Sequence, residues 1–173
     1  MKRVMEKGGV RRTGIPSKEE LEASPGYPKA EALSRGPVVV IECVQDIPCD
    51  PCEPVCPQGA IRVGKPITNL PVFYADKCNA CGLCIPICPG QAIFRVDMTY
   101  AKAKATVSFP YEFLPLPKKG DIVQGVNRAG EVVCDAEVLR VQQPKGFDHT
   151  AVITVVVPKD LAMEVRSMKR LRA

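Results

Sequence analysis

The chain has 173 residues, of which 46% are hydrophobic and 25% are charged, and its net charge is +5. This length is typical of one or two small domains, and the apolar fraction is sufficient for a core. Seventeen prolines argue against long helices, and no apolar run is long enough to span a membrane. The basic start of the chain has no apolar segment behind it, so a secretory signal peptide is not expected.

The charge is spread unevenly along the chain. Residues 37–98 carry a net charge of −2, whereas residues 1–36 carry +3 and residues 99–173 carry +4. Eight of the nine cysteines lie in the acidic segment, which does not favour contact with nucleic acid at the cysteines. The odd count and the C-x-x-C pairs favour metal binding over disulfides, which predicts a reducing, cytoplasmic location.

Residues 1–36 are predicted to form an N-terminal arm rather than a domain. Ser17 and Glu20 have the spacing of a capping box, which predicts one short helix over residues 17–24. Several prolines and glycines interrupt the rest of the segment. Because the arm has too few apolar residues to fold alone, it is either a disordered tail or packed on the body or on a partner subunit.

An internal repeat fills residues 37–98. The stretch "CDPCEPVCPQGAIRV" aligns with the later stretch "CGLCIPICPGQAIFRV" after one inserted residue. Each half is predicted to form a strand, a cysteine loop, a short helical turn and a second strand. The expected entering strands are 38–42 and 72–75, and the expected leaving strands are 60–63 and 92–96.

Residues 99–157 are predicted to form a small β-rich unit, a barrel or sandwich. The expected strands are 103–109, 121–126, 131–142 and 151–157, with turn signals between them. The ninth cysteine, Cys134, lies in the third of these strands and is expected to be buried. For residues 158–173 the apolar spacing predicts an amphipathic helix that begins near Pro158 and packs on the β unit, a partner-binding helix being the alternative. The apolar face consists of Leu161, Val165, Met168 and Leu171.

The cysteines of residues 37–98 have the spacing of iron–sulfur ligands. Cys78, Cys81 and Cys84 follow a C-x2-C-x2-C pattern, and Cys88 comes three residues later with a proline behind it. The first half has matching spacings at Cys49, Cys52 and Cys56, again with a proline after the last cysteine. A cubic cluster has four irons that each need one outer ligand, and thiolates suit iron bound to sulfide. Zinc is a weaker alternative, because a zinc site gives no reason for the third cysteine and the proline in each half.

These motifs, over about residues 38–98, resemble the bacterial two-cluster ferredoxin family. The resemblance implies an α+β fold with a pseudo-two-fold repeat around two [4Fe–4S] clusters. It assigns one cluster to Cys78, Cys81, Cys84 and Cys56. It assigns the other cluster to Cys49, Cys52, Cys88 and one further ligand.

That further ligand departs from the pattern of the family. Cys43 requires a five-residue gap before Cys49, whereas Asp46 keeps the two-residue gap but offers oxygen. Thiolate is the better ligand for iron in a cube, and both Cys43 and Cys78 are expected to leave their strand at the mouth of the cysteine loop. We therefore expect Cys43 to be the ligand. One alternative is that Asp46 is the ligand. The other is a three-iron cluster with no ligand at this position.

No Gly-rich phosphate loop, dinucleotide fingerprint or histidine-based catalytic set accompanies the cysteines. The sequence therefore predicts an electron relay that is not catalytic by itself. The whole chain, especially "IECVQDIPCDPCEPVCP", resembles small iron–sulfur subunits of multi-subunit flavoprotein dehydrogenases that act on proline, hydroxyproline or sarcosine-like substrates. This resemblance implies a flavin-containing partner subunit in a hetero-oligomer. The alternatives are a free-standing ferredoxin and a nucleic-acid-associated module with structural clusters, against which the low aromatic content argues.

Overall fold

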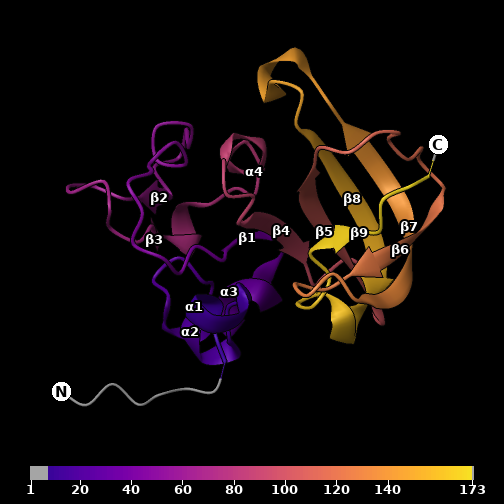
Figure 1. The fold of residues 1–173 in the computed structure, drawn as a ribbon, viewed down its shortest axis with the longest axis horizontal. Coiled ribbons are helices and arrows are strands. Elements are labelled where there is room, and N and C mark those ends of the chain that lie inside the picture. The colour runs from indigo at the N-terminus through magenta and orange to yellow at the C-terminus, as the bar shows by residue number, and fades with distance from the viewer. Residues whose placement is uncertain (1–7, 173) are drawn as a thin grey trace.

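The computed structural model describes residues 8–172. The first seven residues of the expected arm and the last residue of the expected C-terminal helix lie outside this range. Short helices and the cysteine loops form one side of the molecule, and long strands form the other (Figure 1). This mixture of a mainly antiparallel sheet with a few helices agrees with the expected α+β class.

A seven-stranded antiparallel sheet is the main element, with the strand order β1-β4-β5-β8-β7-β6-β9. A separate two-stranded sheet pairs β2 with β3. The strands expected from the sequence are confirmed in both halves of the chain. Their bounds are β1 Val38–Ile41, β2 Ile61–Arg62, β3 Val72–Phe73, β4 Ile93–Asp97, β5 Lys104–Tyr111, β6 Ile122–Val126, β7 Val132–Gln142, β8 Ala151–Pro158 and β9 Ser167–Met168.

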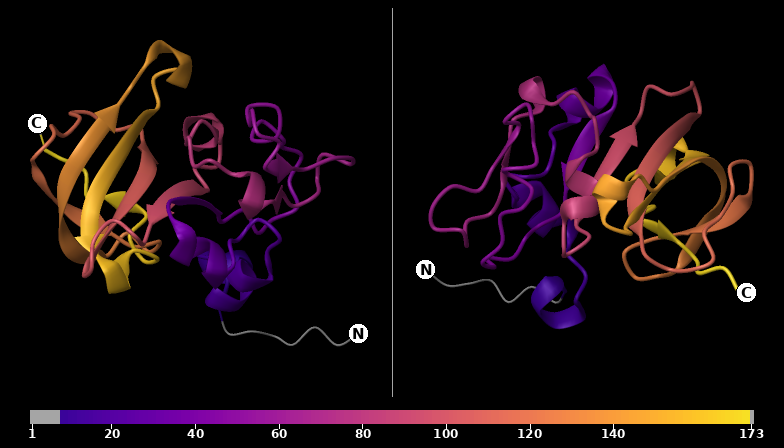
Figure 2. Two further views of the ribbon diagram at one scale, coloured as in Figure 1. Left: turned by 180° about the vertical axis from the view of Figure 1, so that it is seen from behind. Right: turned by 90° about the horizontal axis from the view of Figure 1, so that it is seen from above.

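The main sheet continues through the boundary that the sequence suggests at residue 98. A turn at residues 98–103 follows β4, and the chain returns as β5, which pairs with β4 at Val96 and Val107. Seen from above, the strands beyond this turn curve around a common interior (Figure 2). The cysteine-bearing part and the β unit therefore share one hydrogen-bonded sheet.

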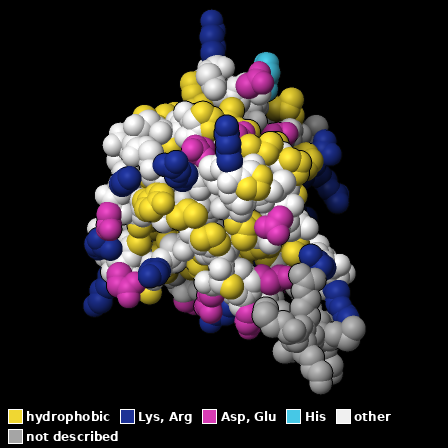
Figure 3. Space-filling model, turned by 90° about the vertical axis from the view of Figure 1, so that its left-hand side faces the viewer, with side chains coloured by type: hydrophobic (Ala, Val, Ile, Leu, Met, Phe, Trp, Pro, Cys, Tyr) yellow, Lys and Arg dark blue, Asp and Glu magenta, His cyan; other side chains and the backbone are white. Residues whose placement is uncertain are grey.

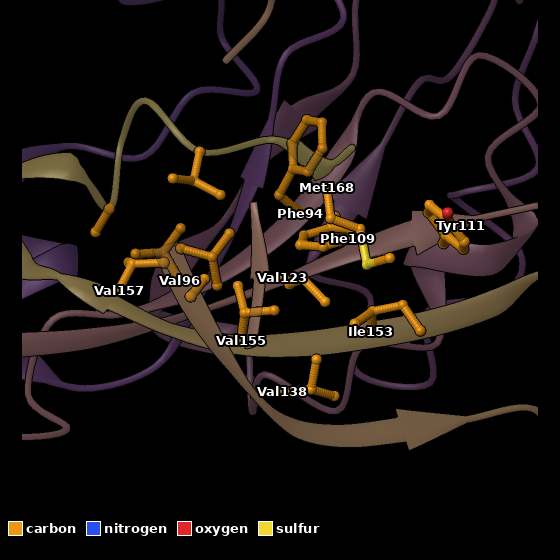
Figure 4. Packing of buried hydrophobic residues seen from close by; sticks show 14 of the residues in the cluster. Phe94, Val96, Phe109, Tyr111, Val123, Val138, Ile153, Val155, Val157 and Met168 are labelled. Carbon is orange, nitrogen blue, oxygen red and sulfur yellow. The ribbon is translucent and has the colours of Figure 1, made fainter. Parts of the chain in front are cut away.

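Side-chain alternation along β1 and β4 gives these strands two buried faces. On one face, Val40, Phe94 and Val96 join a large core with the alternate residues of β5 and β8 (Figure 4). On the other face, Val39 and Ile93 belong to a smaller core that also contains Cys84 and contacts five further cysteines. These two strands are buried on both faces, which explains why "VVVI" is a continuous apolar run. They separate the large core from the cysteine loops.

The helices of the described residues are all short, and none is long and apolar enough to cross a membrane. The capping box of the arm is confirmed: the Ser17 hydroxyl accepts from the Glu20 amide at 3.2 Å, and the Glu20 carboxylate accepts from the Ser17 amide at 2.8 Å. Leu21 is buried, and the Ser24 hydroxyl donates to the carbonyl of Cys43 at 3.1 Å. The described part of the arm therefore packs on the body. Its helices are α1 Val10–Thr13, α2 Lys18–Ala23 and α3 Ala30–Arg35.

The prediction of a C-terminal helix is wrong for residues 158–172. One 3-10 turn, η3 (Lys159–Leu161), is followed by an irregular segment and then by β9, which pairs with the edge of β6. The amides of Arg166 and Lys169 donate to carbonyls of β6 at 2.9 and 2.8 Å. The free edge of β6 thus provides hydrogen bonds that a helix would otherwise make within itself, and tertiary pairing overrides the helical spacing.

Candidate metal-cluster site

Cys56, Cys78, Cys81 and Cys84 surround one narrow pocket whose wall is almost entirely apolar. Cys84 is the buried first residue of α4 (Cys84–Ile87), whereas Cys81 is exposed in the loop before that helix. Cys56 comes from the other half of the repeat, in the turn before β2. The structure thus brings together the four cysteines that the family resemblance assigns to one cluster.

Burial raises the pKa of the Cys84 thiol far above its ordinary value of 9.0. Negative charge on Cys78, Cys81 and Cys56 contributes further to this increase, because all three thiols are close to Cys84. Four thiolates so close together in an apolar pocket need a positively charged partner. Iron bound by these residues would provide that charge and would keep its thiol ligands deprotonated.

Cys43, Cys49, Cys52 and Cys88 form a second set. Three of them, Cys43, Cys52 and Cys88, pack against the smaller core, and Cys49 lies half-buried beside them. Burial raises the pKa of Cys52 to about 12, and the thiols of Cys88, Cys49 and Cys43 add to the increase. Burial also raises the pKa of Cys43, and Cys88 is the next largest cause. All four thiols are therefore near enough to influence one another.

The structure places the two candidates for the further ligand differently. Cys43 is half-buried and close to the thiols of Cys88 and Cys49, two residues after the end of β1. Asp46 is exposed in the loop between Cys43 and Cys49. Asp46 is still close, because its charge makes a small contribution to raising the pKa of Cys43. Cys43 joins the set from the strand end, while Asp46 lies at its solvent side.

The turns after Cys56 and Cys88 have the same local geometry. The amides of Ala60 and Ala92 donate to the sulfurs of Cys56 and Cys88 at 3.3 and 3.4 Å. The residue before each alanine has a left-handed backbone, with φ of 58° at a glycine in the first turn and 50° at Gln91 in the second. Such a backbone costs about 1 kcal/mol at a residue other than glycine, so its retention at Gln91 points to a functional constraint. Donated N–H groups stabilise negative charge on cluster sulfurs.

The thiols of the described residues do not form a site for a single metal ion. Within residues 8–172, no three side chains of His, Cys, Asp or Glu converge closely enough to hold one metal ion. Zinc needs its ligands about 2.3 Å from one central atom. A cube instead presents four separate irons, each of which takes one thiolate, so its ligands stand around a space.

The ninth cysteine lies outside both sets. Cys134 is on β7 as expected, but it is half-buried rather than buried. Its sulfur packs against Gly125 of the neighbouring strand β6.

Sequence reasoning missed a buried charge cluster next to the cysteines. Glu42 lies between β1 and Cys43, and its carboxylate accepts from Arg166 Nε at 2.7 Å and from Arg128 Nε at 2.8 Å. The side chains of Glu42, Arg128 and Arg166 are only 5%, 14% and 4% exposed. The only local signal is a glutamate directly after four apolar residues. The two arginines follow 86 and 124 residues later.

Comparison with protein families gives a match at the second cysteine motif. The profile of the 4Fe-4S binding domain matches residues 71–94. The chain contains a 4Fe-4S ferredoxin domain. That segment includes Cys78, Cys81, Cys84 and Cys88, and it ends on β4. No solved structure matches the chain.

Several characterised proteins are similar to parts of the chain. One component of the ion-translocating oxidoreductase complex of Methanosarcina acetivorans is 47% identical over 47 residues, which are 27% of this chain and 17% of that protein. A polyferredoxin of Methanothermus fervidus is 39% identical over 62 residues, which are 36% of this chain and 14% of that protein. A ferredoxin of Mycolicibacterium smegmatis is 28% identical over 116 residues, which are 64% of this chain and 98% of that protein.

The chain therefore spans about a sixth of the length of two of these relatives and nearly all of the third. The three names refer to a ferredoxin, a polyferredoxin and a subunit of an oxidoreductase complex. Together with the matched domain, they support an iron–sulfur protein with an electron-transfer role.

Proposed function

We propose that this chain relays single electrons through two [4Fe–4S] clusters as the iron–sulfur subunit of a larger oxidoreductase. The observation that carries the proposal is the division of eight cysteines into two sets of four, each completed by a cysteine of the other half. When bound, each cluster would accept and return one electron. The matching turns at Cys56 and Cys88 support a pseudo-two-fold arrangement of the two sites.

In this proposal the residues hold and shield the clusters. Cys43, Cys49, Cys52 and Cys88 would hold one cluster, and Cys56, Cys78, Cys81 and Cys84 the other. The amides of Ala60 and Ala92 would lower the charge density on two of the ligand sulfurs. The apolar side chains of β1, β4 and α4 would keep water from the inner face of both sites.

We further propose that a flavin-containing dehydrogenase subunit docks over the cysteine loops. Hydrophobic side chains gather between scattered charges on the face that these loops form (Figure 3). Leu83 and Ile87, next to Cys84 and Cys88, are 40% and 41% exposed. They line a groove of about 420 Å³ between α4 and the β7–β8 hairpin, which contributes Phe147. Such a groove would bring a partner close to the ligands of both sites. The resemblance of residues 41–57 to subunits of amino-acid dehydrogenases suggests the class of substrate.

The first test is the metal content of the chain purified without oxygen. We expect about eight irons and eight sulfides per chain, because two cubes contain four of each. Reduction with dithionite should produce the paramagnetic signal of two interacting reduced clusters. Stoichiometric zinc without sulfide would contradict the proposal.

The second test concerns the partner. Isolation of the tagged chain from its native host should recover a flavin-containing chain, recognised by its visible absorption spectrum. A free-standing ferredoxin is the second candidate, because the M. smegmatis ferredoxin is covered over 98% of its own length. A lone 18.8 kDa species in native material would favour that candidate over the subunit. A salt-dependent complex with RNA would favour a nucleic-acid module.

A further inference from the structure

We propose that Glu42, Arg128 and Arg166 form a device that positions Cys43 and raises the reduction potential of the cluster bound there. Through these three residues, the β unit would set the reduction potential of one of the two clusters. The inference rests on the proposed function, because it requires a cluster at Cys43. It concerns residues that belong to neither cysteine motif.

The three charged side chains converge from three separate parts of the fold. Arg128 approaches Glu42 with Nε and Nη2 on the two carboxylate oxygens, which is a bidentate pair. Arg166 donates to the carboxylate from the other side and is fixed by the carbonyls of Ala162 and Val165 at 3.1 and 2.6 Å. Arg128 lies in the turn between β6 and β7, and Arg166 lies just before β9. The β unit therefore holds Glu42 in one position.

The backbone of Glu42 connects this cluster of charges to two proposed iron ligands. Cys43 is the next residue, and its carbonyl is held by Ser24. The Glu42 amide donates to the carbonyl of Ala92 at 2.8 Å, and the Ala92 amide donates to the Cys88 sulfur at 3.4 Å. A displacement of Glu42 would therefore move Cys43 directly and the turn of Cys88 through one hydrogen bond. Both cysteines belong to the same set.

The side chain of Glu42 lies on the opposite face of the strand from the thiol of Cys43. Alternation along β1 places Val40 in the large core and Ile41 in the smaller core, and Glu42 and Cys43 continue the same pattern. Glu42 thus cannot compete for iron, and its influence is electrostatic and positional. The guanidinium of Arg166 also lies 5.0 Å from the ring centre of Phe94, on the side of the large core.

Two arginines share one buried glutamate, so the buried part of the cluster carries a net charge of +1. The carboxylate of Glu164 also lies 3.6 Å from Arg128 Nη1, but its side chain is 56% exposed and solvent screens its charge. The positive charge of the buried part is incompletely neutralised, because Arg166 Nη2 has no hydrogen-bond partner among the described residues. A positive charge in a region of low dielectric stabilises the more negative, reduced state of a nearby redox centre. It therefore raises the reduction potential of the nearer cluster by more than that of the farther one.

The second half of the repeat differs at the corresponding position. Lys77 precedes Cys78 as Glu42 precedes Cys43, but it is exposed and lies over the ring of Tyr74 at 5.1 Å. The adjacent Asp76 pairs with Arg35 at 2.9 Å, with both side chains largely in solvent. Solvent screening makes such a pair nearly neutral in its effect. Among the described residues, the charged side chain before Cys43 is buried, whereas the one before Cys78 is exposed.

The test is a pair of charge changes with opposite expected signs, measured by redox titration of both clusters in the loaded protein. Arg128→Gln removes one positive charge and leaves the neutral pair of Glu42 with Arg166. It should lower the reduction equilibrium constant of the Cys43 cluster at least threefold, which is about 30 mV for one electron. Glu42→Gln should raise that constant by a similar factor. The reduction equilibrium constant of the other cluster should change by less than threefold in both variants.

Two control variants separate charge from structure. Arg128→Lys keeps the charge and loses the bidentate geometry. The reduction equilibrium constants of both clusters in this variant should therefore stay within threefold of those of the unaltered protein. Asp76→Asn breaks the exposed pair in the second half and should change neither potential. If Glu42→Gln does not fold, the comparison of Arg128→Gln with Arg128→Lys decides the matter alone.

The proposal is overturned if Arg128→Gln leaves the Cys43 cluster unshifted, or if both clusters shift equally. It is also overturned if Arg128→Gln and Glu42→Gln shift the potential in the same direction, because that outcome indicates general loosening. Failure of the proposed function has a different signature: the unaltered chain would contain no iron and sulfide, and no potential could be titrated at all.

Discussion

Phe94 tests whether the cysteine-bearing part and the β unit unfold together. It lies on β4, the strand that both parts share, and it is only 6% exposed in the large core. Truncation of a buried phenylalanine to alanine costs about 3–5 kcal/mol, because contacts are lost and a cavity remains. Loss of the contact with Arg166 adds about 1 kcal/mol. The sum of about 4–6 kcal/mol is comparable with the total stability of a typical small domain, about 5–15 kcal/mol.

The assay is urea unfolding without oxygen, followed at two signals after a fixed incubation. Visible absorption reports the clusters, and far-ultraviolet circular dichroism reports the strands. With a slope of about 2 kcal/mol per molar urea, Phe94→Ala should lower both midpoints by at least about 2 M. The matched control is Phe113→Ala, at a phenylalanine that is 53% exposed, which should move either midpoint by less than about 0.5 M. A shift of the strand signal alone, with the cluster signal unmoved, would refute the idea of one cooperative sheet.

Three further predictions concern the site and the arm. Cys43→Ala should convert the first cluster to a three-iron form, with about one iron fewer per chain and a new paramagnetic signal in the oxidised state. Asp46→Ala should change neither the iron content nor that signal. The reverse result would assign the ligand to Asp46. Gly26→Ala should destabilise the protein by about 1–3 kcal/mol in the same urea assay, because the new methyl group would lie 2.9 Å from a backbone carbonyl, while Gly146→Ala, with open space around it, should have little effect. In the iron-free protein, burial raises the pKa of Cys52 from 9.0 to about 12, so the unfolded state loses this proton at lower pH than the folded state does. The contribution of Cys52 to the free energy of unfolding is therefore complete below pH 9 and should decline as the pH rises toward 12. Urea midpoints of the iron-free protein on either side of pH 9, compared with those of Cys52→Ser, check this last point; an equal decline in both proteins would contradict it.

The grouping of the cysteines could be predicted from the sequence because most of the information is local. Three ligands of each set lie within a short loop, and the placement of Cys56 and Cys88 in opposite sets is what the resemblance to two-cluster ferredoxins implies. The strands were also predictable, since β-branched residues recur between turn signals at Pro and Gly. The continuous apolar run of β1 even indicates burial on both faces.

Other features depend on contacts between distant parts of the chain. The apolar spacing of Leu161, Val165 and Met168 fits a helix, but burial at intervals of three also arises in a segment that crosses the end of a curved sheet. The amino-acid sequence around the turn at residues 98–103 does not show whether β4 pairs with β5 or whether the turn is a domain boundary. The buried pairing of Glu42 with two distant arginines follows no periodic pattern, so sequence reasoning could not find it.

The distance in sequence between Glu42 and Arg166 has a consequence for how the protein matures. The ribosome adds roughly 5–20 residues per second, so the 124 residues between them take roughly 6–25 s. The cysteines from Cys56 to Cys84 are all complete before β5 has emerged. Ser24 and Ala92 can hold the backbone at Cys43 and Glu42 early, whereas the contact of Arg166 with the Glu42 carboxylate has to wait for the last residues of this segment. The buried carboxylate of Glu42 can therefore gain both of its arginine partners only after Arg166 has been added to the growing chain.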